Sequence, residues 1–428
     1  MMIRWLYCLL IYLLSPLVLW LLYRPRQGKP GFGSRWPEHL GWVPPATGPR
    51  PLWIHTVSVG ESIAAMPLIR ALRQQYPQLP LLVTTTTRTG ADQVARLGDL
   101  VTHRYAPLDY PGAVARFLRR TRPCGLLIME TELWPNWLAA CERRGVPVAV
   151  LNARLSERSC QGYQRFGRLF ARLTRVINPL LCQYRDDAAR FARLGIDEGR
   201  LAVTGSLKFD IQLDEALVAQ GQALHQGLGG RPVLIAASTH QGEDEPLLAA
   251  FATLLQHRPD ALLVLVPRHP QRFDAVAALC QREGFALARR SLGEDIAPNT
   301  QIYLGDTMGE MPLLLQLADV AFMGGSLVPV GGHNLLEPAA LGKPCLIGPH
   351  YFNFQDITRQ LVDCGGAQIV EEASALPALV LALWQDEAAR QAMGTAAFDV
   401  VAANQGALAR TLGHLAPLLT RLQAEATV

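Results

Sequence analysis

The sequence lacks several motifs that would place it in a familiar nucleotide- or metal-binding class. No G-x-G-x-x-G follows an apolar run and no Walker loop is present, so neither dinucleotide nor ATP binding has motif support. No D-x-D occurs, and no cluster of His, Cys and Asp has the spacing of metal ligands. We therefore expect a site that works without a metal ion or a cofactor.

Charge and cysteine pairing are also sparse. Charged residues make up 18% of the chain, and 40 basic against 36 acidic residues leave a net charge of +4. This excess is too small to indicate nucleic acid, and no RNA- or DNA-binding motif is visible. The eight cysteines are scattered without a C-x-x-C. This pattern predicts reduced core thiols in a cytosolic compartment, not a disulfide framework or a zinc site.

One long apolar run, residues 3–22, stands out against this background. It contains no acid and is followed by Arg24, Arg26, Lys29 and Arg35. At about 1.5 Å per residue, roughly 20 such residues cross the hydrocarbon core as a helix. We predict an uncleaved N-terminal membrane anchor in residues 1–30, with the basic flank keeping the rest of the chain cytoplasmic.

Two other interpretations of this run remain open. Pro16 interrupts it, which is compatible with a helix that lies in the membrane interface. A secretory signal peptide would have a shorter apolar stretch and an A-x-A cleavage pattern, and the sequence offers neither.

The rest of the chain alternates short apolar runs with longer amphipathic stretches, which predicts parallel sheets covered by helices on both faces. A looser stretch that ends in Gly-Leu-Gly-Gly divides this pattern into two series. We therefore predict two doubly wound α/β domains facing each other across a cleft, at 31–209 and 231–428, with a linker at 210–230. Strands are expected at 51–58, 79–87, 125–130, 146–153, 200–206, 231–238, 261–270, 301–307, 320–326 and 345–349, and helix over 385–423.

Ligands of open α/β sheets bind beyond the carboxyl ends of the strands, so the polar residues there are the candidates. Glu61 follows the first strand and opens a helix. It is either a charge that stabilises the helix N-terminus or a base aimed into the cleft. Glu130 and Glu132 follow the fourth strand and point to the same side of an extended segment. They suit either a sugar-handling site or a solvated loop.

In the second half, Ser238 follows one strand, and Arg268 with His269 follows the next. The planar guanidinium of Arg268 is the side chain that phosphate prefers.

The segment 324–344, GGSLVPVGGHNLLEPAALGKP, is the most specific in appearance. Its glycines would let backbone amides approach a phosphate, and a helix starting near Asn334 would present its positive end. Glu337 would accept hydrogen bonds from a ribose. His333 has the commoner alternative of a satisfied core histidine.

Taken together, these segments resemble the Kdo transferases, which move 3-deoxy-D-manno-octulosonic acid (Kdo) from CMP-Kdo onto a lipid A precursor in Gram-negative bacteria. The resemblance runs in order from residue 55 to about 355, in HTVSVGES, METELWPN, NARLSERS, TGSLKFD, ASTHQGEDE, LVPRHPQRF, GDTMGEMPLLL and GGSLVPVGGHNLLEPAALGKP. It implies the GT-B glycosyltransferase fold and a location at the bacterial inner membrane.

The resemblance also implies roles for single residues. Glu61 would be the general base, with Glu132 and Glu130 assisting near the acceptor. The residues matching the CMP site are Pro267, Arg268, His269, Met308, Gly309, Glu310, Asn334, Leu335, Leu336 and Glu337, with Ser238 and Lys208 as further phosphate or sugar contacts. Arg88 departs from the family pattern by adding a cation near the expected acceptor site, where it binds a lipid A phosphate or only alters a turn.

Three other functions fit parts of the pattern. A GT-B transferase that uses a UDP-sugar shares the fold and the membrane location. A sugar-nucleotide epimerase of the same fold needs no anchor. A membrane-tethered binding protein would not need the complete set of site segments that this chain has.

Overall fold

The computed structural model describes residues 2–24, 32–211 and 213–426. The chain forms two compact units, and each is described by itself. The first comprises Met1–Asp210 together with Gln405–Val428, and the second comprises Ile211–Asn404.

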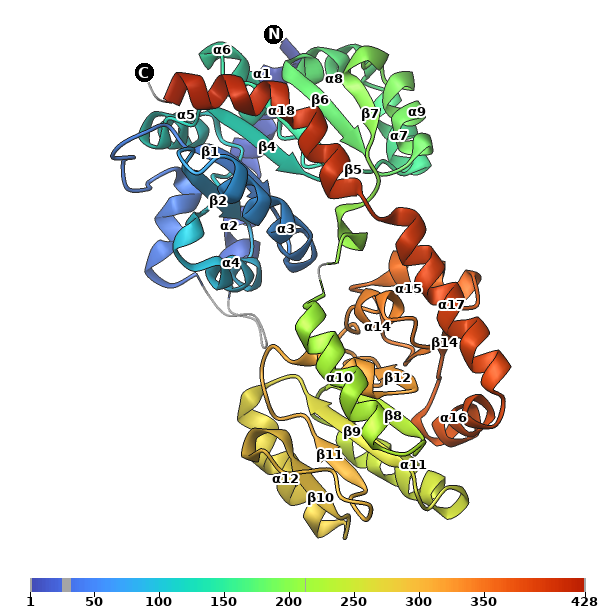
Figure 1. The fold of residues 1–428 in the computed structure, drawn as a ribbon. Coiled ribbons are helices and arrows are strands. Elements are labelled where there is room, and N and C mark those ends of the chain that lie inside the picture. Colours follow the sequence, from blue (N-terminus) through green and yellow to red (C-terminus); the bar gives the residue numbers. More distant parts are fainter. Residues whose placement is uncertain (1, 25–31, 212, 427–428) are drawn as a thin grey trace. The chain divides into compact units, whose positions relative to one another are not determined.

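The first unit is built on a seven-stranded sheet in the order β3-β2-β1-β4-β5-β6-β7 (Figure 1). All neighbouring strands run parallel. The strands are β1 Leu52–Thr56, β2 Leu81–Thr85, β3 Thr102–Tyr105, β4 Gly125–Met129, β5 Val148–Ala153, β6 Ile177–Cys182 and β7 Leu201–Val203. The α-helices are α1 Met2–Leu13, α2 Ser15–Tyr23, α3 Val59–Gln75, α4 Arg88–Val94, α5 Pro111–Thr121, α6 Pro135–Arg144, α7 Glu157–Gln164, α8 Gly167–Leu173, α9 Arg185–Arg193 and α18 Ala407–Ala426. Shorter 3₁₀ segments are η1 Gly33–Leu40, η2 Ala95–Leu100, η3 Thr174–Val176, η4 Glu198–Arg200 and η5 Leu207–Phe209.

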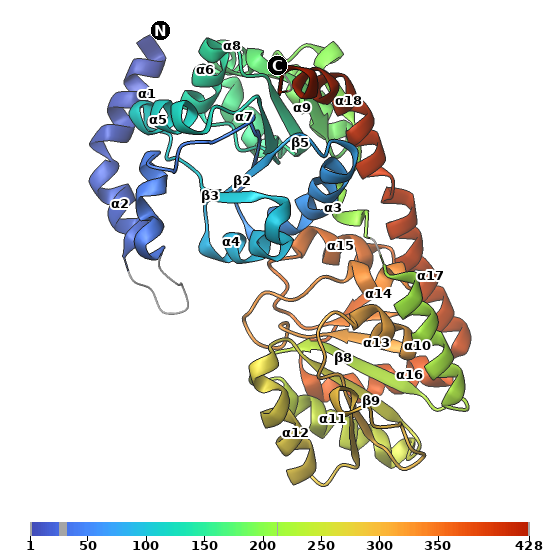
Figure 2. The ribbon, with the colours of Figure 1, turned by 60° about the vertical axis from the view of Figure 1, so that its left-hand side comes forward.

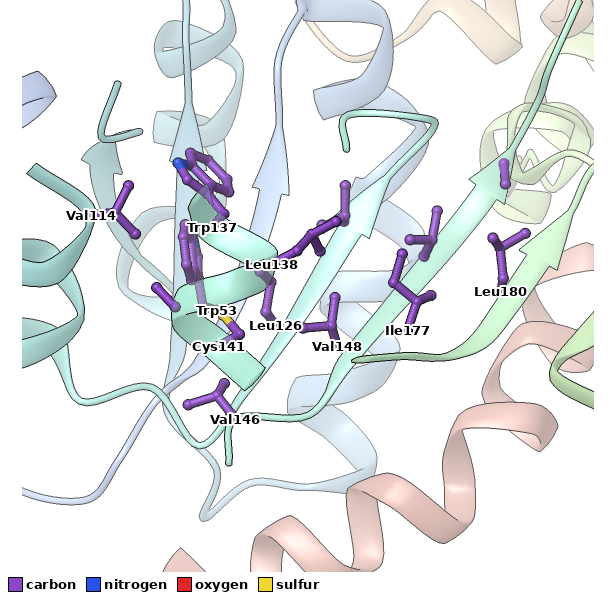
Figure 3. Close-up of a cluster of buried hydrophobic side chains, with 14 of the residues drawn as sticks. Trp53, Val114, Leu126, Trp137, Leu138, Cys141, Val146, Val148, Ile177 and Leu180 are labelled. Atoms are coloured by element: carbon purple, nitrogen blue, oxygen red, sulfur yellow. The ribbon is translucent and has the colours of Figure 1, made fainter. Parts of the chain in front are cut away.

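Apolar residues fill both faces of this sheet, as a parallel sheet requires. Figure 3 shows one face, where Leu126 lies beside α6 and Val148 and Ile177 continue the apolar row on the neighbouring strands. The rings of Trp53 and Trp137 are 4.7 Å apart and fully or almost fully buried. This packing fixes the strand ends that carry the candidate residues of the unit.

The last helix, α18, belongs to the first unit, although the sequence placed it with the second domain. Ala407, Leu415, Leu419 and Leu422 are fully buried in the core on the second face of the first sheet. Asp210 accepts hydrogen bonds from the N–H groups of Gly406 and Leu408. The expected boundary at 231–428 was therefore wrong at its end, because the apolar stripe of α18 completes the first core.

The second unit repeats the architecture with the strand order β10-β11-β9-β8-β12-β13-β14, again all parallel. Its strands are β8 Val233–Thr239, β9 Leu262–Pro267, β10 Leu287–Arg289, β11 Ile302–Leu304, β12 Val320–Met323, β13 Cys345–Ile347 and β14 Ala367–Ile369. Its helices are α10 Glu215–Gly227, α11 Asp244–His257, α12 Phe273–Arg282, α13 Met311–Leu317, α14 Leu336–Ala340, α15 Gln355–Asp363, α16 Leu376–Gln385 and α17 Glu387–Asn404, with 3₁₀ segments η6 Pro270–Arg272, η7 Arg290–Leu292 and η8 Ala373–Ala375. All ten predicted strands are present.

The predicted linker is mostly a helix. Asp214 caps α10 by accepting from the N–H groups of Ala216 and Leu217. The helix packs against α13 so closely that a Cβ at Gly221 would lie 2.4 Å from the carbonyl oxygen of Leu313. This stretch therefore forms part of the second unit and is not a loose connection.

The apolar run at the N-terminus forms two helices, α1 and α2, which are separated at Leu14. Among the described residues, no helix is both long enough and apolar enough to cross a membrane. The predicted spanning anchor is therefore not confirmed. Arg26 and Lys29 of its predicted basic flank lie outside the described residues.

Both helices lie along the first unit beside α5 and η1 (Figure 2). The hydroxyl of Tyr7 donates to Asp109 at 2.9 Å, and the hydroxyl of Tyr23 is 2.8 Å from Nδ1 of His39. Specific polar contacts therefore hold the apolar run on the protein.

We expect Leu419→Ala to lower the free energy of unfolding of the first unit by about 2–5 kcal/mol, because it leaves a cavity under α18. The neighbouring Thr420 is exposed, so Thr420→Ala is the matched control and should change stability by no more than about 0.5 kcal/mol. Urea denaturation measures both. Equal stability of the two variants would show that α18 does not complete this core.

Candidate active site

Several of the candidate residues lie at the switch point of each sheet, where strands added in opposite directions along the sheet meet. In the first sheet the switch point lies between β1 and β4, and in the second it lies between β8 and β12. Ligands of doubly wound sheets bind at the carboxyl ends of these strands. Glu61 follows β1 and Glu130 follows β4, while Ser238 lies near the end of β8.

Glu61 lies in the first turn of α3, whose N-cap is Ser58. Its carboxylate accepts from the N–H of Val57 at 2.7 Å and from the hydroxyl of Ser58 at 3.0 Å. The Ser58 oxygen also accepts from the N–H of Glu61 at 3.4 Å. The carboxylate thus does stabilise the start of the helix, much as in a capping box. Glu61 therefore has the helix-stabilising role that was one of the two interpretations of its position. The other lone pairs of the carboxylate remain available to act as a base.

Burial gives Glu61 the proton affinity of a base that works near neutral pH. Only 7% of the residue is exposed, and desolvation raises the pKa of its carboxyl to about 7. The hydrogen bonds from Val57 and Ser58 oppose this shift, and the charges of Glu130 and Glu132 add to it. An efficient general base has its pKa near the working pH, so the site meets this requirement.

Glu130 and Lys208 form an ion pair at the same edge of the sheet. The Lys208 ammonium lies 3.1 Å from Oε1 of Glu130, and both side chains are partly buried. Glu130 holds a left-handed backbone conformation with φ of 58°, which is uncommon for a residue with a side chain. Lys208 therefore lies in the first unit, beside a carboxylate. Burial raises the pKa of the neighbouring Glu132.

Asn152 positions the turn that carries Lys208. It lies near the end of β5, with φ of 55°, and its Oδ1 accepts from the N–H of Leu207 at 3.0 Å. Sequence reasoning did not single out Asn152, because its role depends on two segments that are remote in the chain.

Arg88 is exposed at the start of α4, next to the loop of Glu61. The N-cap residue Thr87 donates from Oγ1 to the carbonyl of Val57 at 3.3 Å. The cation is therefore carried by a helix that contacts the Glu61 loop, and its role stays a prediction.

In the second unit, three histidines from the loops after β8, β9 and β12 meet. Nε2 of His240 lies 2.9 Å from Nε2 of His333, and the rings of His240 and His269 pack edge to face at 5.1 Å. Burial lowers the pKa of His333 to about 3, so at neutral pH this ring is uncharged. No group of His, Cys, Asp and Glu in the described part of the chain has the arrangement of a metal site.

Arg268 joins this cluster and anchors it to the sheet. Its backbone N–H donates to the carbonyl of Thr239 at 3.0 Å. Burial raises the pKa of Glu337, and the nearby Arg268 guanidinium opposes the shift. Residues predicted from separate motifs, Pro267 at the end of β9 and Glu337 in α14, therefore belong to one region of the second unit.

The predicted residues Met308, Gly309 and Glu310 precede α13. Met308 is 57% exposed, and Gly309 has a left-handed φ of 91°. The Glu310 carboxylate pairs with Arg290 at 2.7 Å, which lowers its pKa. Its charge is therefore already neutralised within the protein.

The glycine-rich segment corrects one expectation and bears out another. The amides of Gly325, Ser326 and Leu327 donate to the side chain of Glu243, so they are not free for a phosphate. The helix expected near Asn334 is α14, which has only five residues and begins at Leu336. Asn334 accepts from the Leu336 N–H at 3.2 Å. The side chains of the predicted contacts Leu335 and Leu336 are fully buried.

Two parallel, doubly wound sheets with candidate residues at their switch points define a GT-B-like chain. The epimerase of Neisseria meningitidis bound to UDP-GlcNAc shares this fold, with a TM-score of 0.52 at 15% identity over 86% of this chain and 99% of that one. A family model described as 3-deoxy-D-manno-octulosonic-acid transferase matches residues 34–211. The 3-deoxy-D-manno-octulosonic acid transferase of Haemophilus influenzae is 41% identical over 98% of this chain and 99% of its own length. The chain belongs to the Kdo transferase family of glycosyltransferases.

A solved C-terminal CMP-Kdo binding domain from Acinetobacter baumannii is also similar. It is 39% identical, covers 44% of this chain and 99% of its own length, and has a TM-score of 0.43.

Substitution of Glu61 should remove a pH dependence of stability. The folded chain holds the Glu61 proton up to about pH 7, whereas the ordinary pKa of such a carboxyl is 4.5. Because the unfolded chain binds fewer protons between these values, the contribution of Glu61 to stability falls as pH rises through this window. Glu61→Gln lacks this loss, so its stability relative to the natural chain should rise between about pH 4.5 and pH 7, by up to about 1.4 kcal/mol per pH unit, and stay level above that window.

Urea unfolding at several pH values measures the difference. Ser156→Ala removes the N-cap of α7 and is the control, because it should cost about 1 kcal/mol at every pH. Parallel pH profiles for Glu61→Gln and the natural chain would mean that Glu61 ionises at an ordinary acidic pH.

Proposed function

We propose that this chain transfers Kdo from CMP-Kdo to the lipid A precursor in lipopolysaccharide biosynthesis, with Glu61 as the general base. The observation that carries the proposal is the buried Glu61 carboxyl at the β1/β4 switch point, with a pKa of about 7. Membership of the Kdo transferase family supports the reaction. The first unit would bind the acceptor and the second unit the donor.

In this mechanism Glu61 removes the proton from a primary hydroxyl of the acceptor's glucosamine disaccharide. The oxygen attacks the anomeric carbon of Kdo from the face opposite CMP, so a carbon–oxygen bond forms and the bond to the phosphate breaks. CMP leaves with the bonding electron pair, and the configuration inverts. General base assistance of this kind contributes about 10²–10⁴-fold.

The acceptor side would use the charged residues around Glu61. Lys208 holds Glu130 by the ion pair of 3.1 Å, and Glu132 lies close enough to raise the Glu61 pKa. We assign Glu132 and Glu130 to binding of the acceptor sugar. Arg88 adds a cation that suits a lipid phosphate.

The donor side would use the histidine and arginine cluster of the second unit. Arg268 supplies a guanidinium for the phosphate of CMP, which gains charge as the bond breaks. Glu337, beside Arg268, is suited to accept from ribose hydroxyls. The remaining contacts would come from Ser238, Pro267, His269, Met308, Gly309, Glu310 and Asn334, and from the backbone of Leu335 and Leu336.

The N-terminal helices would hold the first unit in the membrane interface, on the cytoplasmic face of the inner membrane. Their large apolar side chains are unusually exposed: Trp5 by 74%, Leu6 by 64%, Leu9 by 66% and Leu13 by 74%. An apolar helical face of this kind, with cations nearby, suits insertion into the headgroup region. This arrangement would place the Glu61 site close to a lipid acceptor.

Glu61→Gln should lower turnover by at least about 10²-fold, because the amide keeps the shape but accepts no proton. Incubation with CMP-Kdo and tetraacylated lipid A precursor, followed by mass spectrometry, measures transfer and counts the sugars added. Calorimetry should show unchanged CMP affinity. Glu142→Gln, at an exposed site on α6, is the control and should keep full activity. Turnover by Glu61→Gln within about tenfold of normal would reject Glu61 as the base.

Charged substitutions on the exposed face of α1 should weaken membrane binding without affecting the transfer reaction. Leu9→Glu combined with Leu13→Glu should weaken binding to vesicles of phosphatidylethanolamine and phosphatidylglycerol by at least about tenfold, since each leucine contributes about 1.5–3 kcal/mol when buried. Turnover of a detergent-dispersed acceptor should not change. Leu292→Glu, at a 63% exposed site in the second unit, is the control. Unaltered vesicle binding of the double variant would remove these helices from the membrane contact.

A further inference from the structure

The side chain of Glu243 is completely buried and accepts four backbone hydrogen bonds. Oε2 accepts from the N–H of His240 at 2.8 Å and of Gly325 at 2.6 Å. Oε1 accepts from the N–H of Ser326 at 2.9 Å and of Leu327 at 2.9 Å. Because only donors face it, the group is an acceptor-only carboxylate.

These contacts join the two loops that flank the switch point of the second sheet. His240 and Glu243 lie between β8 and α11, whereas Gly325, Ser326 and Leu327 follow β12. The glycine pair permits the approach. A Cβ at Gly324 would lie 2.7 Å from the carbonyl oxygen of Ser238, and Gly325 has a left-handed φ of 66°.

Three successive amides that converge at the end of a parallel strand form a nest for an anion. A phosphate would normally occupy such a nest, as the sequence led us to expect. Here a carboxylate of the protein occupies it and uses all of its donors. A phosphate of the ligand must therefore be bound elsewhere, by side chains such as Arg268 and His269, and a second phosphate that extends toward the nest meets a buried negative charge.

We propose that Glu243 determines donor specificity: as an internal anion it fills the phosphate nest of the second unit, so the site accepts a nucleotide with one phosphate and rejects one with two. This inference rests on the proposed function, in which the donor carries a single phosphate. It assigns to Glu243 a role in selecting the chemical class of sugar nucleotide.

The test compares CMP with CDP, which differ only by the second phosphate, using calorimetry on the full chain. The natural chain should bind CMP at least about tenfold more tightly than CDP. Glu243→Ala opens the nest, and Glu243→Gln keeps the shape while removing the charge. In both variants the ratio of CMP to CDP affinity should fall by at least tenfold. An unchanged ratio in a folded variant overturns the inference, because a merely structural role would weaken both nucleotides equally.

Asp319→Asn is the matched control. The Asp319 carboxylate also accepts from a backbone N–H of β8, that of Val233 at 2.8 Å, but at the opposite end of the strand. It should lower stability without changing the CMP to CDP ratio. A change of ratio in this control as large as in the Glu243 variants would also overturn the inference.

Failure of the proposed function gives a different result. If the natural chain binds neither CMP nor CMP-Kdo, the proposed donor is wrong and the inference falls with it. If it binds CMP and transfers Kdo but binds CDP equally well, the function stands and only the role of Glu243 is rejected.

Discussion

In both units, the loop after the first strand is held by a carboxylate from the start of the next helix that accepts backbone N–H groups. The number of donors around each carboxylate decides its chemistry. Glu61 accepts from one amide and one hydroxyl, and burial dominates, so the pKa of its carboxyl rises to about 7. Glu243 accepts from four amides, so none of these N–H groups is left to donate to a ligand. The same device thus gives a reactive group in one unit and a fixed internal anion in the other.

The strands and the Glu61 position could be predicted because they depend on local patterns. Buried parallel strands are apolar throughout, and functional residues follow them at fixed places. Four strands, β3, β6, β10 and β14, escaped prediction because they lie toward the sheet edges and are short, partly exposed or interrupted by Pro179. The contacts of Glu243, Asn152 and Lys208 join segments that are remote in sequence, so no local pattern reveals them. The place of α18 escaped for the same reason, since an apolar stripe does not say which core it completes.

Burial of Glu61 has opposite effects on stability and on catalysis. Desolvation makes its ionised form costly in the folded chain, and the charges of Glu130 and Glu132 increase that cost. Desolvation and the two neighbouring charges also make the carboxylate basic enough to take a proton near pH 7. The ion pair between Lys208 and Glu130 limits the repulsion among the three carboxylates. The site therefore holds a strained charge distribution that the surrounding core must stabilise.

The N-terminal run combines apolar side chains with specific polar contacts to the rest of the first unit. Tyr7 donates to the buried Asp109, and Tyr23 contacts His39, so one face of α1 and α2 packs on the rest of the first unit. A helix that crossed the bilayer at this point would have to break these polar contacts, at a cost of about 1–3 kcal/mol for each buried group left unpaired. The side chains of Trp5, Leu9 and Leu13 on the opposite face are exposed. Pro16 is tolerated within the run because it lies in the first turn of α2, where its missing N–H would have no partner within the helix. The different character of the two faces supports the proposed place of these helices between protein and lipid.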